Sequence, residues 1–183
     1  MVANGFKASV FIATSLDGFI AREDGGLDWL PGHEAADTGG EPDATGYQAF
    51  FSSVDALVMG RKSYETVLGF GDEWPYGDKP VLVVSGKLKD SPIETVDVCS
   101  SVENVVAELD RRGYRHVYVD GGQLIQEFLR RNAVRRLVIT RIPVLLGSGI
   151  PLFGKLDHDI PLDHVSTRVL GAGMVQSTYE VRA

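Results

Sequence analysis

The chain has 183 residues, of which 44% are hydrophobic and 23% are charged, a balance typical of one globular domain spanning residues 1–183. Its formal net charge of −7 disfavours general binding to nucleic acid or to membrane surfaces, because both need a basic footprint. A single cysteine, Cys99, excludes an internal disulfide framework, and no apolar run is long enough to span a bilayer. Because residues 1–6 also lack a secretory leader pattern, we expect a cytoplasmic protein.

The first half of the chain predicts short strands that alternate with irregular or helical segments. A strand is predicted at residues 6–13, followed by a turn at Asp17-Gly18. Residues 22–46 are polar and irregular, which is typical of a lid or binding loop. A short helix is expected to end at Ser53. Two apolar strands follow at residues 56–59 and 80–85, with a helix at 61–67 between them.

The second half continues this alternation and then changes character. The pattern Ser100-x-x-Glu103 predicts a capped helix that stops at Gly113. A strand at 116–119, a helix at 123–131 and a strand at 136–142 come next, and two last strands at 164–170 and 174–181 are joined by Gly-Ala-Gly. The fold class is therefore α/β: a mostly parallel sheet with helices on both faces and a C-terminal antiparallel hairpin.

Two strand–glycine–helix junctions carry the strongest chemical signal. They are Gly60-Arg61-Lys62-Ser63 and Gly121-Gly122-Gln123-Leu124. Such a junction leaves backbone N–H groups and the positive end of a helix available to an anion, and glycine lets phosphates approach the backbone. Each junction could equally be only a tight turn. Neither matches the G-x-G-x-x-G fingerprint, and no GxxxxGK[ST] loop is present, so a standard Rossmann domain and a P-loop NTPase are disfavoured.

Four motifs in order along the chain resemble the dihydrofolate reductase superfamily, especially the branch related to the reductase domain of bacterial riboflavin biosynthesis. Listed with x for any residue, they are IAxSLDGxIA (12–21), VMGRKSYE (58–65), VDGGQL (119–124) and PxLLGxGIPLF (143–153). The resemblance implies a dihydrofolate-reductase-like fold, NADPH as cofactor and a small heterocyclic substrate. By analogy with the riboflavin branch it also suggests a homodimer, for which the apolar segment 142–153 is a candidate interface or, alternatively, internal core.

The resemblance also implies where the cofactor binds. We expect its phosphates at Gly60, Arg61, Lys62 and Ser63, its 2′-phosphate at Ser85, Gly86 and Lys87, its pyrophosphate at Gly121, Gly122 and Gln123, and its nicotinamide ring beside Ala13, Ile20 and Leu124. A 2′-phosphate site favours NADPH over NADH. For Ala13, Ile20 and Leu124, plain core packing is an equal alternative.

The proton donor is harder to place, since the family's carboxylate has no exact counterpart. Asp43 is the nearest candidate, one residue out of register, and a partly buried carboxylate could relay a proton. Thr140 matches a threonine that supports the family's acid, and Asp120 could face substrate or cap a helix. We also expect Asp17, Trp29 and Tyr47 to contact substrate. The motif His33-Glu34-x-x-Asp37 lacks a second histidine, so we expect no zinc site.

Three functions remain open from the sequence. The first is an NADPH-dependent reductase acting on a pteridine-, pyrimidine- or flavin-precursor-like substrate. The second is an NADP(H)-binding module or redox sensor without turnover. The third, a nucleotide-dependent transferase, is disfavoured because the phosphate-loop lysine motif is missing.

Overall fold

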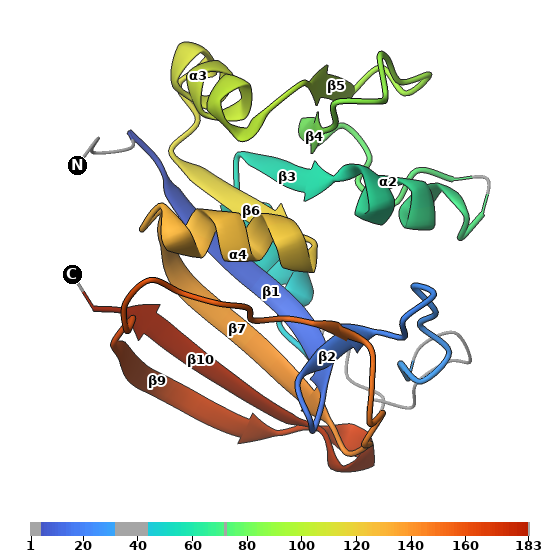
Figure 1. The fold of residues 1–183 in the computed structure, drawn as a ribbon, viewed down its shortest axis with the longest axis vertical. Helices are drawn as coiled ribbons and strands as arrows, with labels where there is room; N and C mark the ends of the chain where they lie inside the picture. The colour runs from blue at the N-terminus through green and yellow to red at the C-terminus, as the bar shows by residue number, and fades with distance from the viewer. Residues whose placement is uncertain (1–4, 32–43, 72, 183) are drawn as a thin grey trace.

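The computed structural model describes residues 5–31, 44–71 and 73–182. One eight-stranded sheet forms the centre of the molecule (Figure 1). Its strands run in the order β5 (Val96–Cys99), β4 (Val81–Val84), β3 (Ala56–Gly60), β6 (His116–Asp120), β1 (Lys7–Ser15), β7 (Val134–Ile142), β10 (Val175–Val181) and β9 (Leu162–Val169). A separate two-stranded sheet pairs β2 (Phe19–Ala21) with β8 (Ile150–Pro151).

Strand directions confirm the predicted topology. The pairs from β5 through β7 are all parallel, whereas β10 runs antiparallel to both β7 and β9. The predicted hairpin is therefore present, and the 3₁₀ turn Gly171–Gly173 lies between its strands. Gly173 has φ +73°, a left-handed conformation that glycine adopts without steric cost.

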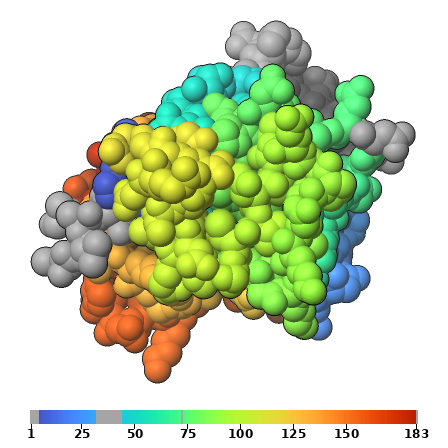
Figure 2. All heavy atoms as spheres, turned by 90° about the horizontal axis from the view of Figure 1, so that it is seen from above, coloured from blue at the N-terminus to red at the C-terminus, as the bar shows by residue number. Residues whose placement is uncertain are grey.

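Helices cover both faces of the parallel part of the sheet, as predicted. On one face, α3 (Val102–Arg112) and α4 (Gly122–Arg130) pack over the even-numbered side chains of β1, such as Ala8 and Val10. On the other, α1 (Tyr47–Ser53) and α2 (Arg61–Leu68) pack in a cluster that includes Phe11. Seen from the end that carries α3, the side chains of this helix and of the β4–β5 segment form one continuous surface (Figure 2).

One local prediction needed correction, and two elements were not predicted. The helix α3 is capped by Ser101 and not by Ser100, because the Oγ of Ser101 accepts the hydrogen bond from Asn104 N–H. The Oγ of Ser100 instead accepts from the side-chain amide of Asn104. Strand β5 and the β2–β8 pair were not predicted, since their segments are short and lack a clear alternation. The expected stop at Gly113 is confirmed by its left-handed conformation, φ +72°.

Within the described residues, no helix is both long and apolar enough to cross a membrane. Edge strand β9 is exposed along its whole length, and its apolar side chains Leu162, Val165 and Val169 face solvent.

Candidate active site

The two glycine junctions lie side by side at the carboxyl edge of the sheet. Strands β3 and β6 are parallel neighbours with Met59 opposite Asp120, so Gly60 and Gly121 leave the sheet at adjacent positions. From here α2 leads to β4 on one side, while α4 leads to β7 on the other. Because both crossovers are expected to be right-handed, the two helices diverge to opposite faces. We call the region between their N-termini the crevice, since ligands of open α/β sheets bind where neighbouring crossovers diverge in this way.

Close packing explains why both positions at the second junction are glycine. Gly121 has φ +95°, and a Cβ there would lie 2.7 Å from the Oγ of Ser63. A Cβ on Gly122 would lie 2.9 Å from the Cδ1 of Ile20 and 3.0 Å from the carbonyl oxygen of Pro151. Any larger residue would therefore push apart α2, α4 and the β2–β8 pair, which together wall the crevice.

Neither helix at the crevice has a side-chain cap. Gly60 and Gly121 occupy the N-cap positions of α2 and α4 and offer no oxygen to the first-turn N–H groups. By contrast α3, which starts away from the crevice, has Ser101 as a conventional cap. Donors without side-chain partners and two positive helix ends at one edge are the features of an anion site.

A third loop extends the crevice beyond β4, the neighbour of β3. The Oγ of Ser85 accepts hydrogen bonds from the N–H groups of Lys87 (3.1 Å) and Leu88 (2.8 Å), which closes a tight turn. This bonding leaves Gly86 and Lys87 exposed at the same edge. The Ser85 hydroxyl thus shapes the loop, and Lys87 has no ion-pair partner among the described residues.

The two basic residues that start α2 differ in their pairing. Arg61 forms an ion pair along the helix with Glu65, with Nη1 2.6 Å from Oε1. Lys62 is exposed and has no carboxylate within ion-pair distance among the described residues. Lys62 is therefore available to an incoming phosphate at once, whereas Arg61 must leave or share Glu65.

Asp120 is the acidic group of the crevice. It is the last residue of β6 and is partly buried, and its carboxylate accepts hydrogen bonds from the Ser63 hydroxyl and the Gly121 N–H. Its pKa is raised above the ordinary value, because the effect of desolvation outweighs that of both hydrogen bonds. Its charge contributes to raised pKa values of Tyr47 and Tyr118, although burial is the larger cause; the pKa of Tyr47 reaches about 12. Asp120 therefore holds a proton more tightly than an exposed carboxyl group.

Thr140 belongs to a polar network beneath the start of α1. Its Oγ1 accepts a hydrogen bond from the side-chain amide of Gln176 (3.1 Å), which also donates to the carbonyl oxygen of Thr45 (3.0 Å). Arg168 donates to the same carbonyl at 2.9 Å. Asp43, the predicted partner of Thr140, lies outside the described residues, as do His33, Glu34 and Asp37.

Asp17 and Leu124, expected to contact substrate and nicotinamide, also make contacts within the protein. The carboxylate of Asp17 accepts hydrogen bonds from Ser15 Oγ (2.6 Å) and from the N–H groups of Leu146 and Gly147, and these bonds lower its pKa. The side chain of Leu124 is buried in the core. A substrate contact for Asp17 and a nicotinamide contact for Leu124 both stay predictions.

The remaining expected residues lie at the same edge or border it. Ala13 is near the end of β1, opposite Thr140, and Ile20 packs against Gly122. Gln123 is exposed in the first turn of α4. The indole Nε1 of Trp29 is buried without a hydrogen-bond partner among the described residues. Ala13, Ile20 and Gln123 thus come from β1, β2 and α4, which the fold brings together, and a substrate contact for Trp29 stays a prediction.

A family model for the RibD C-terminal domain matches residues 7–176. The chain belongs to the RibD C-terminal domain family. The chain is 36% identical, over 167 residues, to the uncharacterized protein YwjB of Bacillus subtilis (strain 168). The aligned region covers 90% of this chain and 92% of that protein.

Solved structures of other proteins share the fold of this chain. A Shewanella sp. PV-4 protein, assigned provisionally to riboflavin biosynthesis, is 37% identical with a TM-score of 0.83, covering 97% of this chain and all of that one. Dihydrofolate reductase of Enterococcus faecalis, solved with NADP(H), has a TM-score of 0.65 at 22% identity and 98% coverage of both chains. The chain therefore has a dihydrofolate-reductase-like α/β fold, and the resemblance seen in its motifs is confirmed.

Some residues of the candidate site were not found from the sequence. Gln176, which links Thr140 to the start of α1, lies in a strand that also holds Ser177, Thr178 and Glu180, so its polar side chain does not stand out in the sequence. Tyr76 and Tyr118, whose phenol groups interact electrostatically with Asp120, lie in segments that give no such signal. In the described part of the chain, no group of three or more His, Cys, Asp or Glu is placed to hold a metal ion.

Proposed function

We propose that the protein is an NADPH-dependent reductase that passes a hydride to a small pteridine-, pyrimidine- or flavin-precursor-like substrate. The observation that supports this most is the crevice between two adjacent helix N-termini, both hinged on glycine and both without side-chain caps. A single pyrophosphate carries two negative charges, so it can contact both of these helix N-termini at once. Membership of the RibD C-terminal domain family supports the same activity class.

The residues at the crevice fit the cofactor. A Cβ at Gly60 or at Gly86 would meet nothing within 4 Å, so open space adjoins the backbone where phosphates would approach. We assign the pyrophosphate to the first-turn N–H groups of α2 and α4. We assign the 2′-phosphate to Lys62 and Lys87, with Arg61 joining once it releases Glu65.

The chain's own contribution to catalysis is mainly positioning. NADPH supplies the hydride when bound, and no side-chain nucleophile is needed for its transfer. Ala13 and Ile20 offer small apolar surfaces on which a flat ring can lie, so the reacting carbons can be held close together and water excluded. The raised pKa of Asp120 keeps a proton on its carboxyl group over a wider pH range, which suits donation of a hydrogen bond or a proton to substrate.

Cofactor binding and turnover are tested separately. Titration with NADPH and with NADH, followed by the change in cofactor fluorescence, should give saturable binding with NADPH the tighter ligand. Oxidation of NADPH is then followed at its absorption band across a panel of pterins, pyrimidines and flavin precursors. Absence of binding contradicts the proposal, whereas binding without oxidation of NADPH by any member identifies a binding module or redox sensor.

We also propose that the protein is a cytoplasmic homodimer. Segment 142–153 is mixed: Ile142 and Leu152 are buried in the core, while Leu145 is 68% exposed. The exposed apolar side chains of β9 form a second candidate surface. Sedimentation equilibrium should give twice the chain mass, and a monomer at all concentrations would contradict the proposal.

A further inference from the structure

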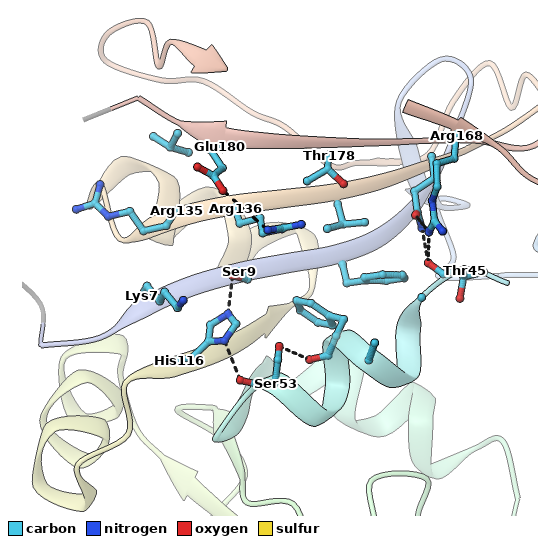
Figure 3. Close-up of a pocket in the computed structure, with 17 residues that line it drawn as sticks. Lys7, Ser9, Thr45, Ser53, His116, Arg135, Arg136, Arg168, Thr178 and Glu180 are labelled. Carbon is cyan, nitrogen blue, oxygen red and sulfur yellow. Dashed lines mark hydrogen bonds and ion pairs between the residues drawn. The ribbon is translucent and has the colours of Figure 1, made fainter. Parts of the chain in front are cut away.

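A cavity of about 540 Å³ lies beside α1 (Figure 3). Gly46, Ala49, Phe50 and Ser53, spaced three or four residues apart on α1, line it. Tyr47 packs on the other side against Tyr118, whose phenol interacts with Asp120. Phe50 packs on the same Tyr118 ring from the cavity side, and no residue of the two glycine junctions lines the cavity.

The floor of the cavity is one face of three adjacent strands. Ser9 lies opposite Arg136 and Phe11 opposite Val138 in the β1–β7 pair, and Thr178 lies opposite Val138 in the β7–β10 pair. Side chains two residues apart on a strand share a face, so Lys7, Ser9 and Phe11 point to the same side. Polar and cationic groups thus gather at one end of the floor and aromatic groups near its middle.

Positive charge in the cavity is largely unneutralised. Four cationic side chains and one carboxylate line it; they are Lys7, Arg135, Arg136, Arg168 and Glu180. The sole ion pair within this set is Arg136 to Glu180, and its 3.9 Å separation is long. The other three cations have no carboxylate within ion-pair distance in the described residues, although the chain carries a net charge of −7.

Arginines elsewhere on the molecule are paired more closely. Arg22 lies 2.7 Å from Asp28, and Arg112 lies 2.8 Å from Asp97. Acidic side chains outnumber basic ones in the chain, 25 to 18, so free cations concentrated in one cavity are not a result of scarce acids. They leave a local positive potential that an anion would relieve.

The pKa of His116, a residue in the wall of the cavity, is affected by this positive charge. Its Nδ1 donates to the Ser53 carbonyl oxygen (2.9 Å), because a carbonyl can only accept, and its Nε2 lies 2.8 Å from the Oγ of Ser9. Burial is the main cause of its lowered pKa; Lys7 and Arg136 lower it further, against the opposing effects of Asp55 and the Ser53 carbonyl. Both cations therefore act at one end of the cavity (Figure 3).

One hydroxyl is also available to a ligand. Thr178 is buried to 7% exposure, lines the cavity and has no hydrogen-bond partner in the described residues. A hydroxyl can donate to an anionic oxygen, and Arg and Lys side chains bind phosphate through charge-assisted hydrogen bonds. Phe11 and Phe50, with ring centroids 5.1 Å apart, offer an apolar surface beside these donors.

We propose that this cavity is a second ligand site that binds a small phosphomonoester carrying a flat ring. Its phosphate lies between Lys7, Arg136 and the Thr178 hydroxyl, and its ring packs on Phe50 and Phe11. The cavity volume is within the range of about 300–1,000 Å³ usual for small-molecule sites. The proposed phosphate and ring contacts share no residue with the two glycine junctions, although Thr45, Arg168 and Gln176 of the Thr140 network also line the cavity.

Calorimetric titration with phenyl phosphate at low ionic strength tests the proposal, with benzoate and inorganic phosphate for comparison. We expect saturable binding of phenyl phosphate, tighter than that of either other probe. The double variant Lys7→Gln/Arg136→Gln should weaken it at least about tenfold, because it removes two charge-assisted bonds. Thr178→Val, which leaves the charges intact, should weaken it less, and the exposed Lys155→Gln is the matched control.

Lys62→Gln separates this site from the crevice. Its affinity for phenyl phosphate should equal that of the unaltered protein. Loss of binding in Lys62→Gln, retention in the double variant, or no saturable heat would each overturn the proposal. If the double variant does not fold in a thermal unfolding test, Lys7→Gln alone and Thr178→Val decide the question in the same titration.

Discussion

Gly121→Ala is the substitution that probes the crevice most sharply. Gly121 has φ +95° and ψ 128°, a conformation that costs a residue with a side chain about 1–3 kcal/mol. The new Cβ would also lie 2.7 Å from Ser63 Oγ, and relieving such overlap costs about 1 kcal/mol or more. A loss of about 2–4 kcal/mol lowers Tm by roughly 4–16 °C in a domain of this size.

The same substitution should weaken NADPH binding, because moving α2 away from α4 separates the two helix ends that share the pyrophosphate. Gly113→Ala is the matched control: Gly113 has φ +72°, but a Cβ there would meet nothing within 4 Å. Differential scanning fluorimetry and NADPH fluorescence titration compare the two variants. The reasoning is refuted if both lose equal stability and neither changes the affinity for NADPH.

Three further predictions test other parts of the account. Lys62→Gln/Lys87→Gln should weaken NADPH binding at least about tenfold while changing NADH binding little, since each lost charge-assisted phosphate contact is worth about 1.5–3 kcal/mol; equal losses in parallel titrations would contradict this. In the unaltered protein, the free energy of unfolding should fall as pH rises from 3.8 through the raised pKa of Asp120, because the folded state holds that proton more tightly. Asp120→Asn should remove this fall. Denaturant unfolding curves measured over this pH range check the prediction, and an unchanged pH profile in the variant would contradict it. Ser101→Ala should cost about 1 kcal/mol of stability by urea unfolding and Ser100→Ala clearly less, and the reverse order would reinstate Ser100 as the cap.

The fold was largely predictable because its signals are local. Apolar runs such as 56–59 and 116–119 mark buried parallel strands, and glycine after each marks the turn into a helix. The cap of α3 was misplaced by one residue since Ser100 and Ser101 adjoin, and the choice depends on backbone angles. The β2–β8 pair joins segments about 130 residues apart, so local patterns carry no trace of it.

The candidate site was predictable only where it follows the backbone. The junctions at Gly60 and Gly121 could be located because a glycine between an apolar strand and a helix marks a turn, whether or not that turn binds a ligand. Side-chain environments could not be predicted. That Lys62 has no ion-pair partner among the described residues, or that Gln176 bridges Thr140 and Thr45, depends on tertiary placement. The cavity beside α1 is built from six segments, and no stretch of sequence displays its charge.

A crystal structure of the protein with bound NADP⁺ would measure the central claim directly. Oxygens of the pyrophosphate should lie about 2.7–3.2 Å from backbone nitrogens in the first turns of both α2 and α4. Contact with only one of these helices, or a cofactor bound elsewhere on the molecule, would contradict the claim that the paired junctions form one cofactor site.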